Sequence, residues 1–169
     1  MFTLKEDEFW AFCLEIYAVD EVKRACLHLQ DEMMFNVNIL LLMMYLCKHD
    51  LAFDFDDIEK LEQGILRSNR ALKKHRVKRR GIKQVSQSLY EKALSEELDM
   101  ERQQQKELLA IASTMKFKHI PVKKVLSEQI AATCARYLTE SRNKRVRALD
   151  TRLLSKETLQ ACSCFVKYL

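Results

Sequence analysis

Glycine and proline are nearly absent from this chain of 169 residues, which contains two glycines and one proline. Sheets and barrels need these residues at their turns, and no alternation of apolar and polar residues indicates a strand. Helix-forming residues dominate instead, and 48% of the chain is hydrophobic, which is enough for one domain with a core. The sequence therefore predicts an all-α, single-domain helical bundle of about six to seven helices.

The chain also lacks a long hydrophobic run and a recognisable secretion signal. Its first fifteen residues are acidic, whereas a signal peptide has a basic start followed by an apolar stretch. The most apolar run, residues 39–47, is shorter than the roughly 20 residues that a membrane-spanning helix needs. We expect a buried core helix there, no transmembrane insertion, and a cytoplasmic protein whose six cysteines are reduced.

Motifs of known enzymes and metal sites are missing as well. The four histidines are scattered, and no pair of them has the spacing of metal ligands. Neither glycine belongs to a phosphate-binding loop or a nucleophile elbow. Glu97 and Glu101 are one helical turn apart, but a di-iron site would also need a histidine three residues after a glutamate. The sequence predicts no metal, no cofactor, and a non-enzymatic protein rather than an enzyme.

Apolar residues recur every three or four positions along most of the chain, which indicates successive amphipathic helices. The fourth helix is expected to run from about Asp54 into a strongly basic stretch, with Gly81 beyond its end. Residues 100–107 are polar nearly all round, so their helix either projects into water or lines something polar. The expected helix starts are Thr3 or Asp7, Asp20, Asn36 or Asn38, Asp54 or Asp56, Ser86, Pro121 and Ser155.

Positive charge is concentrated in residues 67–83, RSNRALKKHRVKRRGIK, where nine of seventeen residues are Lys or Arg and none is acidic. Three interpretations stay open: a solvated helix end, a nucleic-acid or ribosome site, or a site for an acidic protein or anionic membrane. The segment has no aromatic residue, so nucleic-acid binding there would read the backbone instead of the bases. The candidate anion-binding residues, including a second basic run in the tail, are Arg67, Arg70, Lys74, Arg76, Lys78, Arg79, Arg80, Arg142, Lys144 and Arg145.

A second candidate site centres on Asn38, which directly precedes the apolar run. A buried amide must find hydrogen-bond partners. One interpretation is a core network that joins Asn38 to Trp10 or Tyr17. The other is the polar floor of a small pocket, with Trp10, Tyr17, Gln30 and Asn38 as its candidate residues.

Several short motifs resemble an uncharacterised family, known only as a domain of unknown function and found chiefly in proteobacteria. The resemblance covers roughly residues 5–112. Its motifs are FW-x-F-x-x-x-x-Y at residues 9–17, A-C-L-x-L-Q-D and V-N-x-L-L within residues 25–42, L-R-x-x-R-x-x-L-K at residues 66–74, and a Y-x-x-x-x-x-x-E-L-x-x-E-R-x-x-Q helix from Tyr90. The resemblance implies a helical domain over residues 1–115 and brings no activity, substrate or cofactor. Residues 116–169 are expected to form a helical, basic C-terminal extension.

Together these patterns predict a non-enzymatic binding protein with a basic face for an anionic partner, either a nucleic acid or an acidic protein. The alternative is a small-molecule-binding or enzymatic helical domain that uses the polar pocket around Asn38. Exposure of the basic residues distinguishes the two, because a binding face must be accessible and not already paired with carboxylates.

Overall fold

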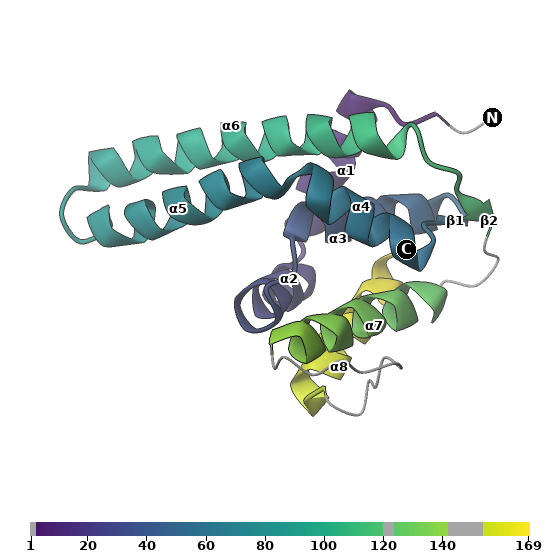
Figure 1. Ribbon diagram of the computed structural model, residues 1–169. Helices are drawn as coiled ribbons and strands as arrows, with labels where there is room; N and C mark the ends of the chain where they lie inside the picture. Colours follow the sequence, from purple (N-terminus) through teal and green to yellow (C-terminus); the bar gives the residue numbers. More distant parts are fainter. Residues whose placement is uncertain (1–2, 120–123, 142–153) are drawn as a thin grey trace.

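The computed structural model describes residues 3–119, 124–141 and 154–169 (Figure 1). These residues confirm the all-α helical bundle, with two strands of two residues each. Among the expected helix starts, Pro121 lies outside the described residues. The elements are α1 (Glu6–Tyr17), α2 (Asp20–Met33), α3 (Val37–Lys48), β1 (Leu51–Ala52), α4 (Phe55–Gly64), α5 (Leu66–Ile82), α6 (Gln87–Ala112), β2 (Lys118–His119), α7 (Lys124–Ser141), α8 (Lys156–Cys164) and a final 3₁₀ turn (Phe165–Tyr168).

The helix starts follow the polar residues of the sequence in most cases. Asn36 and Ser86 cap α3 and α6, because their side chains accept hydrogen bonds from the N–H groups of Ile39 and Leu89. Ser155 caps α8 in the same way. The first two helices differ from the prediction, since the capping positions Lys5 and Val19 make no side-chain capping bond.

Helix α3 lies at the centre of the molecule. All residues from Asn38 to Cys47 are buried, as predicted for a helix that is apolar on every side. It is 12 residues long, and none of the described helices is long and apolar enough to cross a bilayer. The helices around α3 therefore contribute their apolar faces to one shared core.

The predicted fourth helix is in fact two helices, α4 and α5, so the described residues form eight α-helices instead of six or seven. The break falls at Ile65, directly after Gly64, where the backbone leaves the helical conformation. A Cβ atom at Gly64 would collide with the side chain of Ile111 in α6. Gly64 therefore allows a close approach of α4 to α6, and α5 continues through Gly81 to Ile82.

Helices α5 and α6 form a long antiparallel hairpin whose closed end projects beyond the other helices in Figure 1. Leu72 is the buried residue of α5, so apolar packing contributes little to holding this helix in place. Polar contacts to α6, described below, supply the rest of the hairpin's interface.

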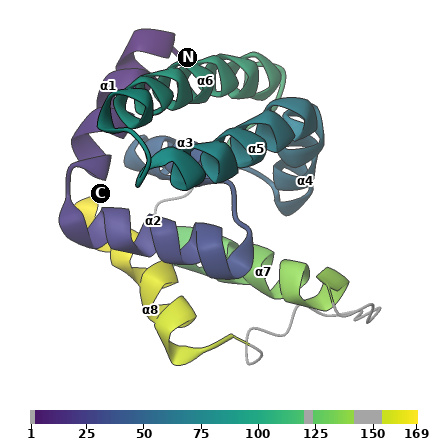
Figure 2. The same ribbon diagram turned by 90° about the vertical axis from the view of Figure 1, so that its left-hand side faces the viewer.

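Helices α7 and α8 lie on the side of α2 away from the hairpin (Figure 2). Their apolar residues, among them Ile130, Cys134 and Phe165, join the same core cluster as Phe9 and Leu40. The strands β1 and β2, which the sequence did not reveal, pair antiparallel, with Leu51 opposite His119. The described part of the predicted extension thus shares one core with the N-terminal helices.

Candidate functional site

Helix α5 presents two chemically different faces. The outer face carries exposed cationic side chains one or two helical turns apart. Within the described residues, none of these side chains has a carboxylate at ion-pair distance. We call this set the outer stripe; it consists of Arg67, Arg70, Lys74 and Lys78.

The inner face of α5 carries two arginines that the sequence had grouped with the outer stripe. Arg76 donates to Glu97 at 3.0 Å, to Glu101 at 2.6 Å and to Gln30 at 2.8 Å. Arg79 donates to Glu97 at 2.5 Å. Only 15% of the Arg76 side chain and 17% of the Arg79 side chain are exposed. Both guanidinium groups are therefore occupied inside the protein.

The remaining predicted anion-binding residues fall elsewhere. Arg80 is exposed, and its guanidinium lies 4.0 Å from the carboxylate of Asp31 at the end of α2. Arg142, Lys144 and Arg145 lie outside the described residues, so a basic face that continues into the tail stays a prediction.

The two carboxylates that face the inner arginines differ in their protonation behaviour. Burial acts to raise the pKa of Glu97, but the hydrogen bonds and charges of Arg79 and Arg76 outweigh it and the pKa is lowered. For Glu101, burial is the larger effect, and the pKa is raised despite the hydrogen bond from Arg76. Glu97 is therefore the firm anionic partner of the pair, and Glu101 the carboxylate that protonates first.

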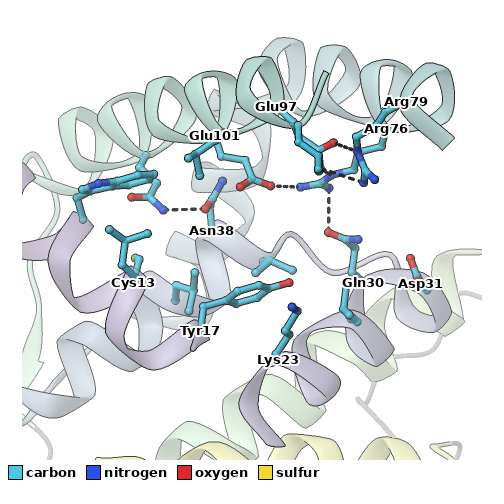
Figure 3. Close-up of a pocket in the computed structure, with 18 of the residues that line it drawn as sticks. Cys13, Tyr17, Lys23, Gln30, Asp31, Asn38, Arg76, Arg79, Glu97 and Glu101 are labelled. Carbon is cyan, nitrogen blue, oxygen red and sulfur yellow. Dashed lines mark hydrogen bonds and ion pairs between the residues drawn. The ribbon is translucent and has the colours of Figure 1, made fainter. Parts of the chain in front are cut away.

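A cavity of about 550 Å³ lies between α1 and α2 on one side and α5 and α6 on the other. Figure 3 shows their side chains facing one another, with the ion pairs of Arg76 along one wall. All four residues that the sequence analysis assigned to a pocket line this cavity: Trp10, Tyr17, Gln30 and Asn38.

The hydrogen bonds of Asn38 differ from the predicted network. Its amide donates to Gln104 at 2.9 Å and accepts from Gln105 at 2.9 Å, and neither Trp10 nor Tyr17 takes part in these bonds. Gln104 and Gln105 belong to the polar stretch of residues 100–107, which the sequence marked as polar without identifying its partner. Two buried glutamines of α6 therefore link this helix to the start of α3.

Two potential nucleophiles in the cavity, the thiol of Cys13 and the phenol of Tyr17, are protonated at neutral pH. Burial raises the pKa of the Cys13 thiol, and it raises the pKa of Tyr17 to about 12. A thiol or phenol with a raised pKa is a weak nucleophile. In the described parts of the chain, no group of three or more His, Cys, Asp or Glu residues is placed to hold a metal ion.

Fold and site together describe an all-α protein with a charged outer helix face and a cavity behind the same helix. Residues 8–108 match the family described as "Protein of unknown function (DUF2390)". This match spans more than half of the chain, and the protein belongs to that family. No curated protein and no solved structure matches the chain.

Proposed function

We propose that the protein is a non-enzymatic binding protein whose outer stripe binds the phosphate backbone of RNA. The observation that carries this proposal is the exposure of four cations on one face of α5 without carboxylate partners among the described residues. From Arg67 to Lys78 the stripe extends about 16 Å along the helix, at 1.5 Å per residue. Dense, accessible Lys and Arg residues are the electrostatic footprint of phosphate binding.

The chemistry of the stripe favours a nucleic acid over the other anionic partners. Protein interfaces rely on buried aromatic and apolar anchors, and the exposed apolar side chains between Arg67 and Lys78 are those of Ala71 and Val77. A membrane-surface helix needs an apolar face to insert, but the apolar side chain of Leu72 is buried in the protein. A charged face without large apolar side chains is suited to binding phosphate groups, because they are recognised by charge and need no pocket.

We further propose a bacterial cytoplasm as the setting, as the resemblance to a proteobacterial family implies. Supporting this, all six cysteines are buried thiols, a state that a reducing compartment preserves. Contacts to phosphates also position a nucleic acid without selecting its sequence, so the protein is expected to bind RNA of mixed sequence.

The test is a salt titration with a fluorescently labelled, mixed-sequence single-stranded RNA, followed by fluorescence anisotropy. Four phosphate contacts predict that the logarithm of the binding constant falls against the logarithm of salt with a slope of about −3. Replacing Arg67, Arg70, Lys74 and Lys78 with Gln should remove most of that slope.

The matched control carries the same loss of charge on exposed cations of other helices and loops: Arg24, Lys92, Lys116 and Lys156 to Gln. Equal weakening by both variants would mean that total charge, and not the stripe, attracts RNA. Salt-independent binding would refute phosphate contacts altogether. Stronger binding to polyglutamate than to RNA would assign the stripe to an acidic protein.

A further inference from the structure

Exposed leucines from three helices surround the cavity behind α5. Leu14 of α1 is 52% exposed and Leu27 of α2 is 39% exposed, while Leu94 and Leu98 of α6 are 41% and 47% exposed. Single exposed leucines are ordinary on protein surfaces, but a group gathered around one concave site marks a place where an apolar body binds. This rim is separate from the outer stripe, which faces away from the cavity.

The arginines and carboxylates of the cavity wall are already paired with one another, whereas Lys23, which also lines the cavity, has no ion pair among the described residues. Each nitrogen of the Arg76 guanidinium donates to a side chain of the protein, namely Glu97, Gln30 or Glu101. An anionic ligand would have to displace these carboxylates from a half-buried cation, which costs the protein strong hydrogen bonds. The arginine wall of the cavity is therefore unsuited to an anion, and Lys23 lies on the opposite wall, on α2.

One buried acceptor beside the cavity has no partner in the described protein. Gln105 is 4% exposed and lines the cavity, and its side-chain oxygen Oε1 accepts no hydrogen bond. The orientation of this amide is fixed, because Asn38 donates to Gln104 and so presents its own oxygen to Gln105 Nε2. The thiol of Cys13 lies beside Gln105, but a thiol is a weak donor.

We propose that this cavity binds an uncharged, amphipathic small molecule. Its apolar body lies between the rim leucines and the rings of Trp10 and Tyr17. A hydroxyl or amide N–H at its inner end donates to Gln105 Oε1, which a small shift of the buried side chain brings to the cavity surface, and this supplies the missing partner. The volume of about 550 Å³ falls within the range of roughly 300–1,000 Å³ that is usual for small-molecule sites.

The chain contains its own reporter for this site, because Trp10 is the single tryptophan and lines the cavity. The probes are n-octanol, methyl heptyl ether and octanoate, followed by tryptophan fluorescence of the full chain. The ether has as many heavy atoms as the alcohol but no donor. We expect saturable binding of octanol, about tenfold weaker binding of the ether because a buried acceptor stays unpaired, and the weakest binding of octanoate.

Equal affinity for octanol and the ether would overturn the role of Gln105, and preferential binding of octanoate would overturn the uncharged class of ligand. The absence of any saturable change would overturn the site itself. These outcomes are independent of the RNA titration, which depends on the opposite face of α5.

Two substitutions on α6 locate the binding. Leu98→Gln places an amide at the rim and should weaken octanol binding several-fold, whereas Leu89→Gln, equally exposed at 53% and away from the cavity, should leave it unchanged. Both are surface changes that the fold tolerates. Gln105→Leu should abolish the preference for the alcohol over the ether. Equal effects of the two leucine variants, or a preference that survives Gln105→Leu, would refute the proposal.

Discussion

Replacing Glu97 tests whether ion pairs hold α5 against α6. Glu97 accepts from Arg76 at 3.0 Å and from Arg79 at 2.5 Å, and its side chain is 11% exposed. Removing one partner of a buried ion pair costs about 3–5 kcal/mol. Because Arg76 keeps its bonds to Glu101 and Gln30, we expect the lower end for Glu97→Ala, about 3 kcal/mol. Glu97→Gln keeps one acceptor oxygen and should lose about 2 kcal/mol.

The assay is urea unfolding at neutral pH, with Glu96→Gln as the matched control. Glu96 is the exposed neighbour on the same helix, and its substitution should change the free energy of unfolding by less than about 0.5 kcal/mol. In the double variant Glu97→Gln with Arg79→Gln, the loss should be smaller than the sum of the single losses, since the unpaired buried cation is removed too. Losses at Glu97 no larger than at Glu96 would refute the view that these ion pairs secure the hairpin.

The pH dependence of the same variants has a definite sign. The pKa of Glu97 is lowered in the folded protein, so its contribution to stability is fully present above the unfolded pKa of about 4.3 and is lost as the pH falls through the folded pKa. The difference in stability between the wild type and Glu97→Gln should therefore be constant near neutrality and shrink in acid. The raised pKa of Glu101 acts in the opposite direction, because its contribution is present in acid and is lost as the pH rises.

Two further predictions concern stability. Asn38→Ala should lower the free energy of unfolding, measured by urea unfolding, by about 2–3 kcal/mol, because the buried Nε2 of Gln105 loses its acceptor. A loss below about 0.5 kcal/mol would show that the amide network is dispensable. Gly81→Ala should raise the thermal midpoint and increase the free energy of unfolding by about 0.5–1 kcal/mol, because Gly81 lies within α5 and a Cβ there meets no atom within 4 Å. A lower midpoint would mean that the last turn of α5 is not helical in solution.

Local signals in the sequence were sufficient for most of the secondary structure. The apolar run predicted the buried α3, and Asn36, Ser86 and Ser155 marked helix starts because capping depends on residues close in the chain. The break between α4 and α5 was missed, since the apolar spacing continues through it. Gly64 precedes the break and lies close to the side chain of Ile111, and a contact between residues so far apart in the chain leaves no periodic pattern in the sequence.

Some features of the candidate site likewise follow from residues close in the chain, and others depend on residues of a different helix. Helical spacing placed Arg67, Arg70 and Lys74 on one face, and the pocket candidates around Asn38 do share a cavity. What the sequence could not show was which arginines of α5 face inward, because Glu97 and Glu101 lie on another helix. The polar stretch of residues 100–107 was the sequence signal for Gln104 and Gln105. It indicated a polar partner, but not that this partner is Asn38 at the buried start of α3.

The two faces of α5 depend on one another through the hairpin. A helix with a single buried residue gains little from the hydrophobic effect and must be held by other contacts. Arg76 and Arg79 provide these contacts through their ion pairs with Glu97. Because Glu97 offsets part of the positive charge on the inner face, the other cations of the segment can lie together on the outer face. Loosening the inner pairs should therefore also disperse the outer stripe, so that Glu97→Gln weakens RNA binding although Glu97 touches no RNA. Because the pKa of Glu97 is lowered, this effect should be present at neutral pH and shrink in acid, where Glu97 is protonated in the wild type too.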